Sequence, residues 1–284
     1  MAAMQRKTRI AIFVLVTAVA GWVFYELYNT GHRFFDLRIY MRALDWWTSG
    51  KDLYDYAQPD FLQEFLYFTY PPFAALLLLP FSFLPLGLVQ VLLTVGTIAA
   101  TIVTTIWIFQ ALGLKMEWVL FAIPLILVME PMRETIPLGQ INMLLVVLVL
   151  LDLLVLAPRG SKWTGVGIGL ATAIKLLPGI FIVYLLLTRQ WRAAIIASVT
   201  AAAATVLAAV VAPRASWDFW THALWDTTRV GRTDVTGNQS LLGMLHRLVA
   251  PDPPNRVIWL LLVVAVLAFG LWHAVIAHRN GNLV

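Results

Sequence analysis

Long apolar runs separated by short polar segments make up most of this chain. The first run, residues 10–28, follows a basic segment and, at about 19 residues, is long enough to cross a hydrocarbon core of about 30 Å. It has no clear small-residue cleavage site, so we expect a retained span and not a signal peptide. Further runs cover residues 73–86, 88–111, 118–130, 141–157, 163–187, 193–212 and 257–277. The pattern predicts an all-α polytopic membrane protein with about eight spans.

Basic residues predict which segments lie on which side of the membrane. Basic loops at 159–162 and 189–192 flank the run at 163–187. Because cytoplasmic loops carry an excess of Lys and Arg, we expect both loops inside and the run to be a hairpin bent at 175–179. The run at 73–86 is short and contains two prolines, so it is expected to dip into the outer face without crossing.

On this topology both termini are cytoplasmic, and the polar segments gather on the extracytoplasmic face. These segments are residues 29–72, 130–142, 175–179 and 213–256. The chain, 1–284, is predicted to form a single transmembrane domain in which 29–72 is the first outer loop and 213–256 the last. Any chemistry is therefore expected on the extracytoplasmic face of the cell membrane.

The first outer loop contains an amphipathic stretch that begins at Asp36. Apolar positions at helical spacing are Leu37, Tyr40, Met41, Leu44 and Trp47, and the polar positions opposite them are Arg38, Arg42, Asp45 and Ser49. This spacing predicts an interfacial helix lying on the membrane, with Asp36 at its N-terminal end. An Asp in that position can serve simply as an N-cap, which stabilises a helix by about 1 kcal/mol.

Composition agrees with a membrane protein and excludes several other classes. Hydrophobic residues make up 61% and charged residues 12% of the chain, against about 25% charged residues in a typical soluble domain. The net charge of +5 comes from short basic clusters and not from a continuous stripe, which favours membrane anchoring over nucleic-acid binding. The chain has no cysteine, so disulfides, thiolate catalysis and Cys-ligated metals are excluded.

Six different short motifs are distributed over most of the chain. They are "DLRIY" at 36–40, "GKDLY" at 50–54, "YPPFAALLLLPFSFLP" at 70–85, "GQIN" at 139–142, "GLATAIKLLP" at 169–178 followed by "RQWR", and "NQSLLGMLHRL" at 238–248. Taken in this order, they resemble glycosyltransferase family 87. That family contains polyprenol-phosphate-mannose-dependent α-1,2-mannosyltransferases of actinobacteria, and the resemblance implies a membrane fold of the GT-C type.

The resemblance implies a catalytic role for Asp36. In GT-C enzymes an aspartate of the first outer loop takes the proton from the acceptor hydroxyl while that oxygen attacks the anomeric carbon of the sugar. A carboxylate suits this role because it is ionised at neutral pH, and general-base assistance is typically worth about 10²- to 10⁴-fold in rate.

The sugar donor is expected to be a lipid phosphate. The sequence has no Asp-x-Asp pair, no Gly-rich phosphate loop and no His/Cys cluster, so no metal or other cofactor is expected. Lys175, inside an apolar hairpin, is the main candidate for binding the phosphate, although it can also snorkel or pair with a carboxylate. Arg133 is the second candidate, and it can equally pair with Glu130 or Glu134.

Other polar residues of the outer segments are candidates for substrate binding. They are Arg38, Tyr40, Tyr70, Gln140, Asn142, Asn238, Gln239 and Ser240. The tyrosines can stack on sugars and the amides can bind sugar hydroxyls. Tyrosines are also common at membrane surfaces, and Gln140, Asn142 and Ser240 can simply begin helices.

Members of the family generally continue past the length of this chain, with further spans and a late outer-loop motif containing paired histidines. We therefore expect a shortened member, a sequence truncated by a frameshift or a misassigned gene end, or one part of a split enzyme whose second subunit supplies the missing spans. The favoured interpretation is a membrane hexosyltransferase that uses a polyprenyl-phosphate sugar and a glycolipid acceptor. A catalytically impaired, lipid-binding partner subunit is the alternative, and a transporter is less favoured because no internal repeat is seen.

Overall fold

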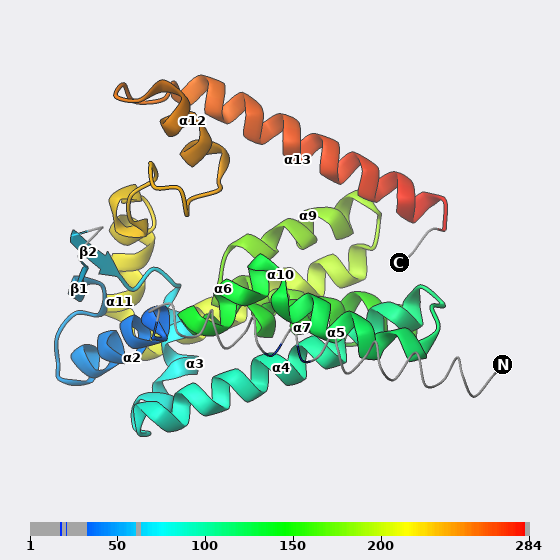
Figure 1. Ribbon diagram of the computed structural model, residues 1–284, viewed down its shortest axis with the longest axis horizontal. Coiled ribbons are helices and arrows are strands. Elements are labelled where there is room, and N and C mark those ends of the chain that lie inside the picture. Colours follow the sequence, from blue (N-terminus) through cyan, green and yellow to red (C-terminus); the bar gives the residue numbers. More distant parts are fainter. Residues whose placement is uncertain (1–17, 19–20, 22–32, 61–63, 282–284) are drawn as a thin grey trace.

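The computed structural model describes residues 33–60 and 64–281, together with Ala18 and Gly21. The first predicted span, residues 10–28, lies outside the described residues except at those two positions. The described chain is a helical bundle (Figure 1). One end of the bundle, here called the α2 end, carries α2 (Phe35–Thr48), the hairpin of β1 and β2, and α11 (Pro213–Asp218). The other end is called the opposite end.

The predicted apolar runs form helices in the structure. Of the described helices, α4 (Leu86–Ala111), α10 (Trp191–Val211) and α13 (Arg256–Arg279) are long and apolar enough to cross a membrane. The shorter helical segments are α3 (Pro72–Ser82), α5 (Val119–Val128), α6 (Glu130–Leu138), α7 (Asn142–Leu150) with its continuation η3 (Leu151–Leu156), α8 (Val166–Ile174), α9 (Ile180–Leu187) and α12 (Leu241–Val249). An all-α membrane protein is therefore consistent with the structure. The count of eight spans is not confirmed, because several runs form helices too short to cross alone.

The run at 163–187 folds as a hairpin, as its flanking charges predict. Helix α8 ends at Ile174, Lys175 has extended backbone angles, and a short turn, η4 (Leu177–Gly179), leads into α9. The ends of the run meet at the opposite end of the bundle, where Thr164 and Arg189 line one cavity. Pro178 follows the break, where a proline is easily accommodated in the first turn of a helical segment.

Close packing of α8 on α10 holds this hairpin in the bundle. A Cβ atom on Gly169 would lie 2.5 Å from the carbonyl oxygen of Ala197, so only glycine allows this approach of the two helices. The buried carboxylate of Asp152 accepts a 2.7 Å hydrogen bond from the backbone N–H of Ile168 in the first turn of α8. Asp152 thus helps to satisfy one of the N–H groups that a helix start leaves without an intrahelical partner.

The segment predicted as the first outer loop differs from its prediction in two ways. A small antiparallel sheet joins β1 (Ala57–Asp60) to β2 (Glu64–Tyr67), with Ala57 opposite Tyr67. The apolar face of α2 is buried in the protein against α3 and α6, with Leu44 fully inaccessible, where a helix lying on the lipid surface was predicted. The same periodicity fits both environments, because lipid and a protein core each accept an apolar helix face.

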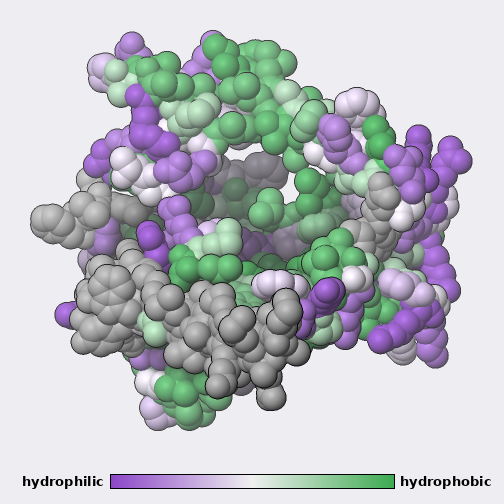
Figure 2. Space-filling view, turned by 45° about the vertical axis from the view of Figure 1, so that its right-hand side comes forward, coloured by the Kyte–Doolittle hydropathy of each residue, from purple (hydrophilic) through white to green (hydrophobic). Residues whose placement is uncertain are grey.

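Helix α13 stands apart from the rest of the bundle. None of its residues is buried, and its main contacts within the described chain are with α9 and α12. In the space-filling view an opening separates this part of the chain from the body of the protein, and hydrophobic surface lies between hydrophilic regions toward the edges of the view (Figure 2). Its exposed apolar surface is suited to contact with lipid.

Candidate functional site

The start of α2 is fixed against the end of α6. Phe34 has a left-handed backbone, with φ of 57°, and its N–H donates a 2.7 Å hydrogen bond to the carbonyl oxygen of Pro137. Gly139 ends α6 with φ of 76°, and a Cβ atom on it would lie only 2.7 Å from Cβ of Leu37. This close approach places Asp36, in the first turn of α2, beside Gln140.

Replacing Gly139 with Ala should destabilise the protein by about 1–3 kcal/mol, because it adds a collision with Leu37 to the strain of a left-handed alanine. The thermal unfolding midpoint in detergent measures this effect. Gly113→Ala is the matched control, since Gly113 has a similar φ of 62° but nothing within 4 Å of an added Cβ atom. Equal destabilisation by the two substitutions would contradict the proposed close contact.

A chain of hydrogen bonds connects Asp36 to Lys175. Gln140 donates from Nε2 to Oδ2 of Asp36 at 2.7 Å, and Asn142 donates from Nδ2 to Oε1 of Gln140 at 2.5 Å. The Nζ of Lys175 donates to Oδ1 of Asn142 at 3.3 Å. The structure thus brings together four residues that the sequence analysis selected from three separate segments.

Two tyrosines lie beside this chain. The hydroxyls of Tyr40 and Tyr70 are 3.0 Å apart, and Nζ of Lys175 lies 5.2 Å from the centre of the Tyr70 ring. Burial raises the pKa of the Tyr70 hydroxyl to about 12 and that of Tyr40 well above its ordinary value. Both hydroxyls are therefore protonated at neutral pH. The two residues are only 6% and 5% exposed, which leaves little ring face for the sugar stacking expected from the sequence.

These residues surround a cavity of about 430 Å³, here called the site cavity. Its wall includes Asp36, Tyr40, Tyr70, Gln140, Lys175 and Arg229. Asn142 is not part of the wall and reaches the cavity through Gln140 and Lys175. A carboxylate and an ammonium group therefore face one space that is large enough for part of a substrate.

Arg229, in the segment predicted as the last outer loop, also contributes to the wall of the site cavity. In the structure its guanidinium donates to the backbone carbonyl of Tyr54 and lies 4.4 Å from the centre of the Tyr67 ring. These contacts join the segments predicted as the last and first outer loops, across 175 positions of sequence. Tyr67, Thr69 and Phe219 also line the cavity and were not selected from the sequence.

Arg133 and Arg38 are outside the wall of the site cavity. Arg133 lies on α6, and its guanidinium is 3.6 Å from the carboxylate of Glu134, in agreement with the pairing alternative. Arg38 is half-buried on α2, and within the described part of the chain its Nε has no hydrogen-bond partner.

The predicted residues at 238–240 are also outside the wall of the site cavity. Ser240 caps α12 by accepting from the N–H of Gly243 at 3.1 Å, Asn238 accepts from Ser240, and Gln239 donates to the backbone carbonyl of Thr236. Their hydrogen bonds are those of a loop and a helix start, as the capping alternative predicts.

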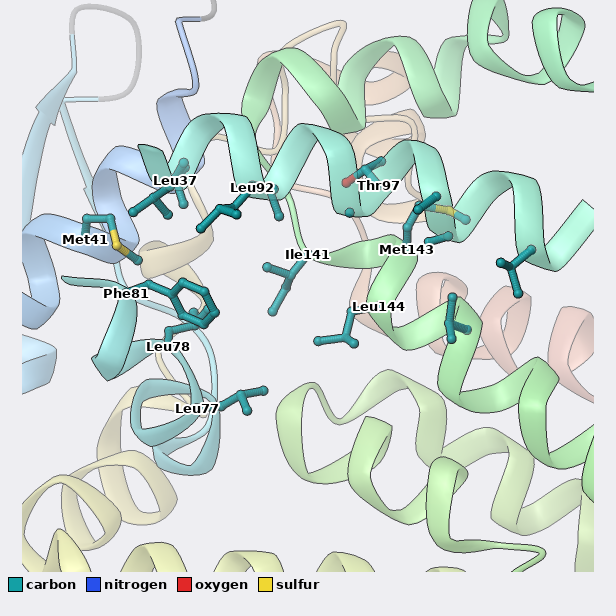
Figure 3. A pocket seen from close by; sticks show the side chains of 17 residues that line it. Leu37, Met41, Leu77, Leu78, Phe81, Leu92, Thr97, Ile141, Met143 and Leu144 are labelled. Carbon is teal, nitrogen blue, oxygen red and sulfur yellow. The ribbon is translucent and has the colours of Figure 1, made fainter. Parts of the chain in front are cut away.

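An apolar groove of about 510 Å³ begins at α2 and runs along α4 (Figure 3). Its walls come from α2, α3, α4 and α7 and include Leu37, Met41, Leu78, Gly96, Ile141 and Leu144. Asp36 and Gln140 face the site cavity, while the residues that follow them, Leu37 and Ile141, face the groove. The same two segments of chain therefore border a polar and an apolar space.

No group of three or more His, Asp or Glu side chains that could hold a metal ion occurs among the residues that the structure describes. The polar groups of the site cavity include one carboxylate, the side-chain amide of Gln140, tyrosine hydroxyls and two cations. Within the described residues, cations are thus the groups suited to binding an anionic substrate.

Comparison with known proteins relates most of the chain to one family. Residues 68–284 match the model of glycosyltransferase family 87. The chain is 33% identical over 281 residues to a polyprenol-phosphate-mannose-dependent alpha-(1-2)-phosphatidylinositol mannoside mannosyltransferase of Mycobacterium tuberculosis, covering 92% of this chain and 65% of the relative. The protein of the same name from Mycolicibacterium smegmatis is 32% identical over 289 residues, again with 65% of its length covered.

A more distant relative carries a different activity in its name. An alpha-(1->3)-arabinofuranosyltransferase of Mycobacterium tuberculosis is 27% identical over 246 residues, which cover 83% of this chain and 53% of that protein. No solved structure matches the chain. The chain thus spans 65% of the length of the two more similar relatives described above.

Proposed function

Since the chain belongs to glycosyltransferase family 87, we propose that it is a hexosyltransferase that transfers mannose. The donor is a polyprenyl-phosphate sugar, and the acceptor is a hydroxyl of a cell-envelope glycolipid or lipoglycan. The names of its relatives support this donor and a phosphatidylinositol mannoside as the acceptor. The observation that carries the proposal is the site cavity, in which the carboxylate of Asp36 and the ammonium of Lys175 face one space.

In this proposal Asp36 is the general base. The acceptor oxygen bonds to the anomeric carbon while its proton passes to the carboxylate, and the bond from that carbon to the phosphate oxygen breaks. Gln140 orients the carboxylate through its hydrogen bond to Oδ2. Attack on the face opposite the phosphate inverts the anomeric carbon, so a β-linked mannosyl phosphate gives an α-linked product.

Lys175 and Arg229 receive the phosphate of the donor. The bond pair released at the anomeric carbon leaves with the phosphate, and two cations in a partly dehydrated cavity stabilise the added negative charge. The amide oxygen of Asn142 positions the ammonium of Lys175. Tyr40 and Tyr70 are protonated at neutral pH, so they add neutral hydrogen-bonding groups and no further charge.

The lipid chain of the donor lies in the apolar groove. The groove begins at Leu37 and Ile141, one residue after two groups of the site cavity, so a prenyl chain there brings its phosphate close to the cations. We place the site on the extracytoplasmic face of the cell membrane, because the basic loops lie at the opposite end of the bundle.

The test is a transfer assay in membranes that contain the protein, with radiolabelled polyprenyl-phosphate mannose and a phosphatidylinositol mannoside. Label should appear in a larger glycolipid, and it should continue to appear in excess EDTA, because cations of the protein hold the phosphate. Absence of product from folded protein would favour the alternative of a lipid-binding partner subunit. Loss of product in EDTA alone would contradict the metal-independent mechanism.

Replacing Gly96 with Trp should obstruct the groove without disturbing the fold, because nothing lies within 4 Å of an added Cβ atom at this position. We expect the KM for a long-chain prenyl donor to rise about five-fold. The effect is modest because the prenyl chain moves from lipid to protein, so that packing contacts and not transfer out of water hold it in the groove. A donor with a short prenyl chain should be affected little.

Val95→Trp is the matched control for this experiment, since Val95 is exposed on α4 and does not line the groove. Equal effects of Gly96→Trp and Val95→Trp, or equal effects on long and short donors, would place the lipid chain elsewhere.

A further inference from the structure

Two adjoining cavities lie at the opposite end of the bundle, away from the site cavity. Their volumes are about 640 Å³ and about 370 Å³, and both are lined by Ala157 and Gln190. The end of α4, the end of η3, the turn between α9 and α10, and the end of α13 contribute to their walls. Four separate parts of the chain therefore build this region.

Cations border both cavities. Arg159 lines the larger cavity, to which His278 contributes an imidazole ring, and Arg189 and Arg192 line the smaller one. Within the described part of the chain, none of the three arginines forms an ion pair or a hydrogen bond through its side chain. Unpaired guanidinium groups that line neighbouring cavities are suited to binding phosphate, often in a bidentate geometry.

The backbone at Arg189 gives a second observation. Arg189 follows the end of α9 with φ of 60°, and the N–H of Gln190 donates to the carbonyl oxygen of Leu185 at 2.8 Å. Glycine is the residue that most easily takes this left-handed position after a helix, and arginine is strained there. An arginine in a backbone conformation that favours glycine suggests that its side chain has a binding role that offsets the strain.

Apolar side chains in the walls suit the upper part of a lipid. Trp107, Leu154 and Val155 line the larger cavity together with its polar groups. Tryptophan is typical of the depth at which headgroups meet acyl chains. The larger cavity also joins the end of α13 to α4 and η3, with which α13 otherwise has few contacts.

We propose that these cavities bind the headgroup of an anionic phospholipid in the leaflet at this end of the bundle. Arg159, Arg189 and Arg192 contact the phosphate, and Gln190 and His278 provide further polar contacts. The acyl chains lie beside Trp107, between α4 and α13, and attach the end of α13 to the bundle. The site requires that the chain is embedded in a bilayer and is independent of sugar transfer.

The experiment measures phospholipid retained by the purified full chain after exchange into detergent with equal amounts of phosphatidylglycerol and phosphatidylcholine, using native mass spectrometry. The unsubstituted chain should retain phosphatidylglycerol in preference. Arg159→Gln and Arg189→Gly should each weaken this retention about five-fold, the effect of removing one charge near an anionic surface. Arg189→Gly relieves backbone strain, so a folding defect cannot explain its loss of lipid.

Lys115→Gln is the matched control, because it removes a charge from the loop after α4 without altering either cavity wall. Equal loss of phosphatidylglycerol in Lys115→Gln and Arg189→Gly would overturn the site and indicate a diffuse basic surface. Equal retention of the two lipids by the unsubstituted chain would also overturn it. Displacement of the lipid by millimolar inorganic phosphate would show a site for free phosphate and contradict the proposal.

Discussion

Asp36→Asn should lower the rate of mannose transfer by about 10²- to 10⁴-fold, the range lost when a general base is removed. An asparagine side chain has nearly the same shape and still accepts a hydrogen bond from Gln140, so α2 keeps its position. It cannot take up the proton of the acceptor hydroxyl. Initial rates at saturating donor and acceptor measure the effect, and it should appear in kcat more than in KM.

Asp45→Asn is the control for Asp36→Asn. Asp45 lies on the same helix, is exposed, and does not line the site cavity. Its substitution should leave the rate within about two-fold, as is usual for surface positions away from functional features. If Asp36→Asn retains more than a tenth of the activity with an unchanged unfolding midpoint, another group is the base.

Lys175→Gln should reduce kcat/KM for the donor by about 10- to 100-fold, since hydrogen bonds to a charged group contribute about 1.5–3 kcal/mol. Glutamine keeps a polar group that can still donate to Asn142, but it provides no positive charge. The phosphate then binds less tightly and its charge is less well stabilised as it leaves. Steady-state kinetics with varied donor and fixed acceptor measures the loss.

Lys51→Gln tests whether any nearby cation has the same effect. Lys51 is exposed at the α2 end of the bundle, where its ammonium lies 3.7 Å from the centre of the Trp46 ring, and it is outside the site cavity. We expect its loss to change kcat/KM little. If Lys175→Gln raises the KM for the acceptor and leaves the KM for the donor constant, Lys175 contacts the acceptor, and the proposed orientation of the two substrates is wrong.

The helices were predictable from the sequence because their signals are local. The apolar runs at 88–111, 193–212 and 257–277 correspond closely to α4, α10 and α13. The break at Lys175 was also predictable, since a charge and a proline within an apolar run disfavour a continuous helix. The number of spans stays a prediction, because several apolar runs form helices too short to cross a membrane alone.

The site was only partly predictable, because its assembly depends on contacts between distant segments. Asp36 was selected through the family resemblance, Gln140 as an amide at the start of an apolar run, and Lys175 as a charge inside one. Arg229 could not be ranked highly, since its loop carries no local pattern that predicts contact with Tyr54. Conversely, Ser240 had a strong local signal, and the structure shows that this signal belongs to a helix cap.

The pair of cations in the site cavity has a consequence for turnover. In the proposed reaction the phosphate arrives as a diester and departs as a monoester, which carries more negative charge. Lys175 and Arg229 should therefore hold the spent carrier more firmly than the loaded one. Release of the discharged lipid phosphate, and not bond breaking, would then limit the turnover rate. The discharged lipid would also compete with the loaded donor for the cavity.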